Sequence, residues 1–177
     1  MSKFKEERIS GKVVYAGNFI EVHRDVVRLP DGSQATRDFI RHPGAVGIVA
    51  LTDAGEVVLE RQYRYPVARD LVEIPAGKPE SGEAHLETGK RELLEETGYS
   101  AARWTYLGQI HNAIGYSDEA IELWLAKGLT KGEAKLDKGE FLEVFTLPFD
   151  EALAMAADGR ISDVKTIVGL YWAAARR

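Results

Sequence analysis

The sequence predicts an α/β protein, a mixed sandwich in which many β-strands are interspersed with a few helices. Runs rich in β-branched and aromatic residues fill the N-terminal third of the chain and recur further on. Three other segments show helical patterning and are bounded by typical helix-capping residues. The 177 residues contain no internal repeat and no linker-like stretch, so we expect one domain with a substantial core.

Nine strands are expected, separated by turn signals. The tetrapeptide Pro-Asp-Gly-Ser at 30–33 and the segment 52–56, which contains Asp and Gly, each favour a turn between two strands. The short strand at 71–74 runs into Pro-Ala-Gly at 75–77. The expected strands are 13–15, 19–29, 34–40, 45–51, 57–62, 71–74, 104–110, 121–126 and 141–147.

Three helices are expected. The first covers 83–97, and Gly98 is its candidate C-cap. The second covers roughly 149–157 and is entered through Pro148 and Asp150. The third covers 162–176, with Ser162 or Asp163 as N-cap.

Composition restricts the classes of function. The net charge of -5 argues against a nucleic-acid backbone as the main partner. The chain has no cysteine, which excludes disulfides and thiolate metal sites and fits a cytoplasmic setting. The N-terminus lacks the apolar core of a signal peptide and no run reaches membrane-spanning length, so we expect no membrane partner. An acidic protein that binds a phosphate ester would need cations to neutralise the negative charge of the ester.

The first expected helix carries a cluster of carboxylates. At about 100° per residue, Glu92 and Glu96 differ by about 40°, and Glu95 lies about 60° from Glu92 on the other side. The three side chains therefore share one face, and their repulsion is relieved by hard cations such as Mg²⁺. A solvated acidic face is the common alternative for a Glu-rich helix. Gly89 lies between the acidic and apolar faces, where close packing would explain it.

The wider window separates these two interpretations. Gly77 is followed after five residues by Glu83 and after seven more by the run RELLEETGY at 91–99. This pattern resembles the Nudix box, with Tyr99 in place of the usual aliphatic residue. The resemblance implies a Nudix fold, a mixed-sheet α/β/α sandwich with an N-terminal antiparallel strand region. Its box residues would be Gly77, Glu83, Arg91, Glu92, Glu95, Glu96 and Gly98. Within one domain, 1–177, residues 1–42 would serve dimerisation and 43–177 would form the catalytic core.

Further segments are similar to the ADP-ribose pyrophosphatase branch of that family. They are 62–65 with 71–77, then 115–119, 139–144 and 161–166; Ile114 stands where the branch usually has proline. The resemblance implies Mg²⁺-dependent hydrolysis of ADP-ribose to AMP and ribose 5-phosphate, with Mn²⁺ as a possible substitute. It also implies metal ligation by Glu92, Glu95, Glu96 and the backbone oxygen of Ala76. Catalysis would rest on Glu92, Glu96 and a general base, Glu140.

The same resemblance suggests contacts to the substrate. Arg64 is expected to pair with a phosphate and Glu73 with the ligand or a neighbouring group. Arg37 and Phe39 are candidates for phosphate and adenine contacts, and Tyr116 is a further candidate. In relatives the N-terminal strands cross to a second subunit, so a homodimer is implied.

Two other functions stay open at this point. GDP-mannose or a dinucleoside polyphosphate would use the same machinery with another leaving group, and Tyr116 lies near a tyrosine found in dinucleoside polyphosphate hydrolases. A module that senses ADP-ribose without cutting it belongs to another class. Such modules usually lose box carboxylates, which are all present here.

Overall fold

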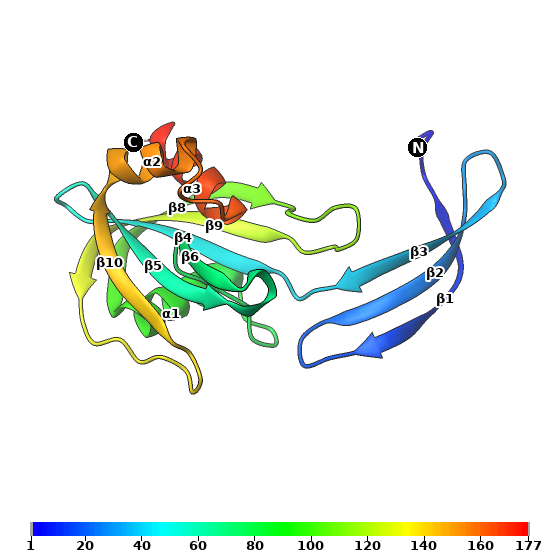
Figure 1. The fold of residues 1–177 in the computed structure, drawn as a ribbon, viewed down its shortest axis with the longest axis horizontal. Helices are drawn as coiled ribbons and strands as arrows, with labels where there is room; N and C mark the ends of the chain where they lie inside the picture. The colour runs from blue at the N-terminus through cyan, green and yellow to red at the C-terminus, as the bar shows by residue number, and fades with distance from the viewer. Residues whose placement is uncertain (1, 177) are drawn as a thin grey trace. The chain divides into compact units, whose positions relative to one another are not determined.

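The computed structural model describes residues 2–176, and the chain divides into two compact units (Figure 1). The N-terminal unit runs to Gly44 and also takes in His111–Glu119. The second unit consists of Ala45–Ile110 and the chain from Ala120 onward. The loop 111–119, which was expected within the catalytic core, thus belongs to the N-terminal unit. No helix within the described residues is long and apolar enough to cross a membrane.

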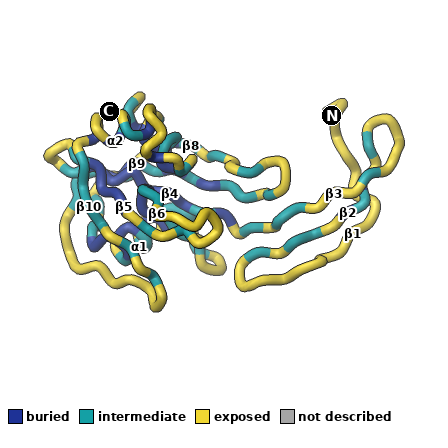
Figure 2. The backbone as a smooth tube through the Cα atoms, viewed as in Figure 1, coloured by how far each residue is buried: buried dark blue, intermediate teal, exposed yellow. Residues whose placement is uncertain are grey.

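The N-terminal unit is a three-stranded antiparallel sheet with the order β1-β2-β3. Its strands are β1 (Glu7–Ala16), β2 (Glu21–Arg28) and β3 (Gln34–Arg41). The predicted turn at 30–33 is present, because the Leu29 amide donates to the Ser33 carbonyl and the Asp31 carboxylate accepts the Ser33 amide. Among residues 2–44 and 111–119, Val27 is the only apolar side chain that is buried (Figure 2).

The second unit is built on a seven-stranded mixed sheet. Five strands follow the order β10-β5-β4-β9-β8, while β6 pairs with β5 and β7 with β4. The β4–β9 pair is parallel and the other pairs are antiparallel. The strands are β4 (Ala45–Leu51), β5 (Glu56–Arg64), β6 (Arg69–Glu73), β7 (Ala76–Gly77), β8 (Tyr99–Ile110), β9 (Ile121–Lys131) and β10 (Leu142–Pro148).

Helices cover both faces of this sheet, as the sequence predicted. Successive residues of a strand point to opposite faces, and β4 shows this alternation. Ile48 packs in one cluster with Leu93 of α1 (His85–Thr97). The next residue, Val49, packs in the other cluster with Phe149 of α2 (Phe149–Ala157) and with residues of α3 (Val164–Ala174). The predicted α/β/α sandwich is therefore confirmed.

Every predicted strand and helix is found, but most have different ends; for example, β8 begins at Tyr99 instead of at 104. The strand at 45–51 and the helix at 149–157 have the predicted bounds. Asp163 is the N-cap of α3, where its carboxylate accepts the Thr166 amide, and Gly98 closes α1 with φ of 73°. Two elements were not predicted, the short strand β7 and the 3₁₀ helix η1 (Tyr65–Val67).

A local separation of two strands positions the site. The strands β4 and β5 pair only through Leu51 and Val57, beside their connecting turn. Further along, β4 pairs with β7 while β5 pairs with β6. The connection between β6 and β7 therefore lies where the two strands have parted, and α1 contacts both β4 and β7 there.

Candidate active site

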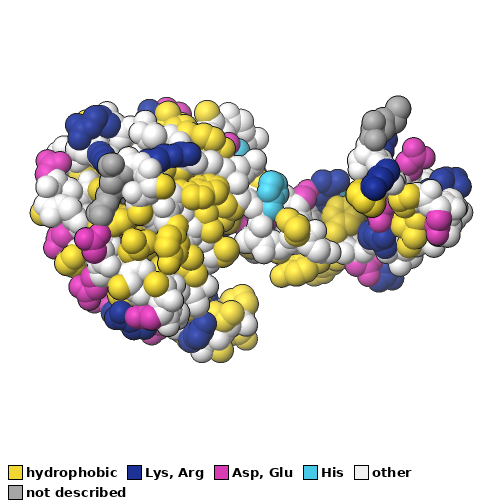
Figure 3. Space-filling view, turned by 90° about the horizontal axis from the view of Figure 1, so that it is seen from above, with side chains coloured by type: hydrophobic (Ala, Val, Ile, Leu, Met, Phe, Trp, Pro, Cys, Tyr) yellow, Lys and Arg dark blue, Asp and Glu magenta, His cyan; other side chains and the backbone are white. Residues whose placement is uncertain are grey.

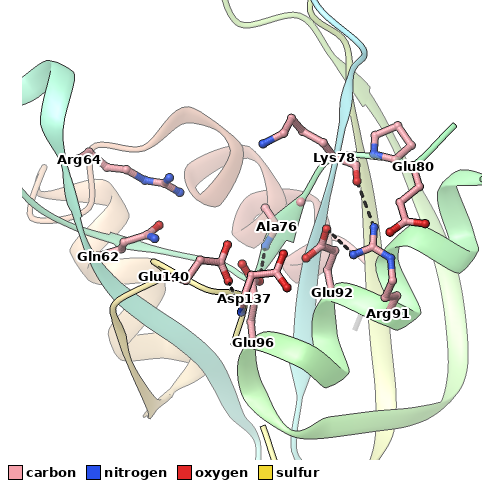
Figure 4. A pocket seen from close by; sticks show the side chains of 12 residues that line it. Gln62, Arg64, Ala76, Lys78, Glu80, Arg91, Glu92, Glu96, Asp137 and Glu140 are labelled. Atoms are coloured by element: carbon pink, nitrogen blue, oxygen red, sulfur yellow. Dashed lines mark hydrogen bonds and ion pairs between the residues drawn. The ribbon is translucent and has the colours of Figure 1, made fainter. Parts of the chain in front are cut away.

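A polar cavity of about 340 Å³ lies beside β7 and the acidic face of α1 (Figure 4). The carboxylates of Glu92, Glu96 and Glu140 point toward a shared space, and Arg64 extends toward it from β5. The lining residues come from β5, the 76–80 segment, α1 and the loop before β10: Gln62, Arg64, Ala76, Gly77, Lys78, Pro79, Glu80, Arg91, Glu92, Glu96, Asp137 and Glu140.

Gly77 is required because the Glu92 side chain lies directly on it. A Cβ at position 77 would be 1.9 Å from Glu92 Oε1 and 2.0 Å from its Cδ, far inside van der Waals contact. Gly89 has a similar role within α1 itself, where a Cβ would be 3.2 Å from Val46 Cγ1 of β4. The predicted close packing at Gly89 is thus present, and the two glycines let α1 approach the sheet closely.

Arg91 connects the carboxylates around the start and middle of α1. Its Nη1 lies 2.9 Å from Glu92 Oε1 and 3.0 Å from Glu95 Oε2, so the predicted contact with Glu95 is present. Its Nε and Nη2 both donate to Glu83 at 3.0 Å. The Nη2 also donates to the carbonyl of Lys78 at 3.1 Å.

Glu83 has a different place from the one expected. It was expected in the first turn of the helix, but α1 begins at His85 and Glu83 precedes it. Hydrogen bonds from Arg91, and then from the Glu80 amide, lower the pKa of Glu83 to about 2. The fixed negative charge holds Arg91 in place instead of stabilising the helix end.

Glu96 is the most deeply buried of the box carboxylates. It is 7% exposed, and its Oε2 accepts the backbone amide of Ala76 at 3.1 Å. Burial, and then repulsion from Glu60 and Glu92, raises its pKa above the usual range for a glutamate. Burial likewise raises the pKa of Glu92. The site thus concentrates buried acidic groups whose pKa values are raised by burial and mutual repulsion, although Arg91 pairs with Glu92.

Glu60 of β5 is a buried acidic residue that the sequence reasoning missed. It is 4% exposed, its Oε1 has no hydrogen-bond partner, and burial followed by repulsion from Glu73 raises its pKa. A period of two in β5 could have identified it, because Val58 faces the α1 side of the sheet and Glu60 is the next residue on that side.

Glu140 lies in the loop between β9 and β10 and lines the cavity. Its Oε2 accepts the backbone amide of Asp137 at 3.2 Å. Its charge also contributes to the raised pKa values of Glu92 and Glu96, so it lies close enough to interact with both. Glu95 differs from the other acidic residues, since its side chain is 37% exposed and it does not line the cavity.

Arg64 and Glu73 form a pair on the β5–β6 side of the cavity. Arg64 donates from Nε to Glu73 Oε1 at 2.6 Å and from Nη2 to Oε2 at 2.8 Å. Arg64 lines the cavity, whereas Glu73 is only 3% exposed and lies behind it. Glu73 thus orients the arginine, and its direct contact with a ligand stays a prediction.

The other predicted substrate contacts gather in the N-terminal unit. Arg37, Phe39 and Tyr116 line a second cavity of about 330 Å³, between β2, β3 and the 114–118 segment. The Ile40 amide donates to the Tyr116 carbonyl, which brings this segment alongside β3. Arg37 itself is paired with Glu6 through two hydrogen bonds.

The donor chemistry of the first cavity fits a hard divalent cation. Among residues 2–176, no three His, Asp or Glu side chains already stand in a metal-binding arrangement. Glu92 and Glu96 nevertheless line the cavity with oxygen donors, and their raised pKa values reflect charge that a cation would compensate. The nearby Glu60 adds a buried carboxylate oxygen, Oε1, that has no hydrogen-bond partner.

Comparison with known proteins agrees with these features. Residues 41–167 match the NUDIX domain, and residues 6–40 match the nucleoside diphosphate sugar hydrolase N-terminal domain. The chain is 36% identical over 174 residues to the ADP-ribose pyrophosphatase of Bacillus subtilis (strain 168), covering 97% of this chain and 94% of the relative. It is 40% identical over 171 residues to the methanol dehydrogenase activator of Bacillus methanolicus, covering 96% and 92%.

A third relative and a solved structure extend the comparison. The ADP-ribose pyrophosphatase of Mycobacterium tuberculosis (strain ATCC 25618 / H37Rv) is 35% identical over 174 residues, which cover 96% of this chain and 84% of the relative. The crystal structure of an ADP compounds hydrolase superposes with a TM-score of 0.87 at 20% identity, covering 99% and 96% of the two chains, and supports the fold. Nudix hydrolases generally need a divalent metal ion. With its acidic cavity formed by the matched region, the chain belongs to the Nudix hydrolase family.

Proposed function

We propose that this chain is a Mg²⁺-dependent pyrophosphatase that hydrolyses ADP-ribose to AMP and ribose 5-phosphate. The observation that carries the proposal is the cavity in which Arg64 faces the carboxylates of Glu92 and Glu96. Such a cavity suits a diphosphate, whose charge can be shared between a guanidinium and bound cations. Two relatives at 35–36% identity are named ADP-ribose pyrophosphatase, which supports this choice of substrate.

The metal would be held by oxygen ligands. Glu92, Glu95, Glu96 and the backbone oxygen of Ala76 are the proposed ligands, and Mn²⁺ is a possible substitute. When bound, divalent ions neutralise the diphosphate and polarise its phosphoryl groups. Burial of Glu96 against the Ala76 amide fixes that carboxylate, and Gly77 leaves room for Glu92 above the strand.

Each remaining side chain has one proposed role. Glu140 accepts a proton from the attacking water, whose oxygen bonds to phosphorus as the anhydride P–O bond breaks. The leaving phosphate keeps the bridging oxygen and the electron pair. Arg64 binds a phosphate oxygen, held in orientation by Glu73. Arg91 fixes Glu92 and Glu95 at the edge of the cavity.

The N-terminal unit would complete the nucleoside end of the site in a homodimer. Residues 1–42 are proposed to mediate dimerisation and 43–177 to carry catalysis. Arg37, Phe39 and Tyr116, which line one cavity, are the proposed contacts for adenosine and its phosphate. The match of residues 6–40 to an N-terminal domain of nucleoside diphosphate sugar hydrolases supports a role of this unit in handling the substrate.

A substrate panel tests the proposal. ADP-ribose, GDP-mannose and diadenosine tetraphosphate are incubated with the protein and Mg²⁺, and the products are separated by ion-exchange chromatography. We expect the highest kcat/KM for ADP-ribose, with AMP and ribose 5-phosphate in equal amounts. A preference for GDP-mannose would favour the GDP-mannose pyrophosphatases, which are 32–35% identical to this chain. Tight ADP-ribose binding without any product would favour a sensing module.

A further inference from the structure

A chain of ion pairs behind the cavity wall connects helix α3 to Arg64. Lys165 Nζ contacts Glu73 Oε2 and lies 3.1 Å from Asp163 Oδ2. Glu73 in turn receives both hydrogen bonds of Arg64. The sequence separates Lys165 from Glu73 by 92 residues, so only the fold brings them together.

This lysine is buried although it does not line the cavity. Lys165 is 8% exposed, and the side chains of Lys165 and Glu73 are 11% and 4% exposed. The Arg64 side chain is 42% exposed and is the solvent-exposed end of this series of ion pairs. Burying an ammonium group is costly unless it is paired, so Lys165 is held in place by the two carboxylates that it contacts.

The start of α3 is fixed firmly enough to act as an anchor. Asp163 caps the helix by accepting the Thr166 amide at 3.0 Å and the Thr166 hydroxyl at 2.6 Å. The Thr166 hydroxyl accepts the amide of Ile74, the residue after Glu73, at 2.8 Å. Thus the segments carrying Lys165 and Glu73 are joined by the hydrogen bond from the Ile74 amide to the Thr166 hydroxyl as well as by the ion pair.

Opposing influences act on the pKa of Glu73, and Lys165 is one of those that lower it. Burial alone would raise the pKa of Glu73, but Arg64 and Lys165 together hold it below the usual range. The buried Glu60 repels Glu73 from the neighbouring strand. Lys165 contacts Oε2 while both oxygens accept hydrogen bonds from the Arg64 fork, so the carboxylate is held from two directions.

We propose that Lys165 is a positioning residue for diphosphate binding, which acts through Glu73 to hold the Arg64 guanidinium in the cavity. The inference rests on the proposed function, in which Arg64 binds a phosphate. It adds a residue of α3 that touches neither substrate nor metal. Its effect is therefore on substrate affinity and not on the chemical step.

A double-mutant cycle tests the inference. The variants are Lys165→Met, Arg64→Met and the double variant, with Lys90→Met as control, since Lys90 forms an exposed pair with Glu87 outside the cavity. For ADP-ribose we expect Lys165→Met to raise KM about tenfold while kcat changes less than about threefold. The Mg²⁺ concentration that gives half-maximal activity should not change. Lys90→Met should match the wild type.

The double variant distinguishes positioning from general damage. If Lys165 acts through Arg64, the double variant has the KM of Arg64→Met alone, because the interaction is already lost. Multiplied effects of the two substitutions, an unchanged KM in Lys165→Met, or a loss confined to kcat would each overturn the inference. If Lys165→Met does not fold, as judged by its melting curve, Lys165→Gln replaces it in the same cycle with the same expected results.

The experiment distinguishes a failure of this inference from a failure of the proposed function. Wild-type protein without ADP-ribose hydrolysis refutes the proposed function. Normal wild-type hydrolysis, a raised KM in Arg64→Met and an unchanged KM in Lys165→Met refute only the role of Lys165.

Discussion

The two units of the chain differ in what they bury. The unit around the mixed sheet encloses an apolar core on each face and three acidic side chains, Glu60, Glu73 and Glu96. In the described part of the N-terminal unit, Val27 and Asp25 are the buried apolar and charged side chains. Figure 2 shows this contrast as a change from dark blue and teal to mostly yellow. The residues to which the proposed reaction assigns catalysis thus all belong to one unit.

Most side chains of the N-terminal unit are instead exposed. All ten residues of β1 are exposed, including Val13 at 45%, Val14 at 43% and Tyr15 at 59%. Figure 3 shows apolar side chains interspersed with charged ones over this unit. An exposed strand at a sheet edge is a site where another chain can pair or pack. The contrast therefore assigns chemistry to one unit and, in our proposal, recognition and dimerisation to the other.

The largest effect is expected from removing a buried charge in the catalytic unit. Glu96→Gln should lower kcat for ADP-ribose by about a thousandfold or more, because a ligand charge for the metal is lost. The fold should survive, since the amide oxygen can still accept the Ala76 amide. Steady-state kinetics and circular dichroism melting measure the two effects. Unchanged turnover in this variant would refute the role of Glu96 as a ligand.

A smaller effect is expected from filling the space at Gly77. The Cβ of Gly77→Ala would meet the Glu92 side chain at 1.9 Å, so that carboxylate must move while the core is not affected. We expect turnover to fall by about ten- to a hundredfold, with little change in melting temperature. Gly132→Ala is the control, because a Cβ there meets only the Gly98 carbonyl oxygen at 3.3 Å. Equal activity in the two variants would show that the position of Glu92 is not critical.

Charges placed on β1 should separate the two roles of the units. We expect Val13→Asp combined with Tyr15→Asp to convert a dimer into a monomer in light scattering after size exclusion, and to raise KM for ADP-ribose. The control is Tyr171→Asp on α3, whose tyrosine is 46% exposed in the other unit. A wild-type protein that is itself monomeric, or a variant that stays dimeric, would contradict the proposed function of the N-terminal strands.

The smallest effect expected is a pH dependence of the stability of the metal-free protein. Burial raises the folded-state pKa of Glu60 and Glu96 above the unfolded value near 4.5. Above that value the unfolded state has lost protons that the folded state keeps, so stability is full below it and declines as pH rises through the raised pKa values. Melting temperature in EDTA should therefore fall from pH 5 toward alkaline pH, and Mg²⁺ should reverse part of the fall. A metal-free melting temperature that rises over this range would contradict the assignment.

Sequence reasoning succeeded where the determining interactions are local. Glu92 and Glu96 line the cavity from one face of one helix, as their spacing predicts, and Gly98 closes that helix through its own backbone. Glu95, expected on the same face, does not line the cavity. The reason for Gly77 could be stated only after the fold placed Glu92 above it.

It failed where distant segments meet. Strand β7 consists of two residues and exists because β4 has parted from β5, which no local pattern encodes. Glu83 was misplaced because α1 begins only at His85, and the partner that holds Glu83, Arg91, lies eight residues away. The contact of Lys165 with Glu73 spans 92 residues and leaves no trace in composition or periodicity. These contacts depend on how the sheet separates and not on the sequence nearby.

The most direct test of the central claim is an anomalous diffraction experiment on crystals soaked with Mn²⁺ and ADP-ribose, using the Glu140→Gln variant, which lacks the proposed base, to slow turnover. We expect manganese peaks in the cavity beside Glu92 and the Ala76 carbonyl, with the diphosphate between the metal and Arg64. Manganese peaks elsewhere, with the diphosphate bound away from these residues, would contradict the account.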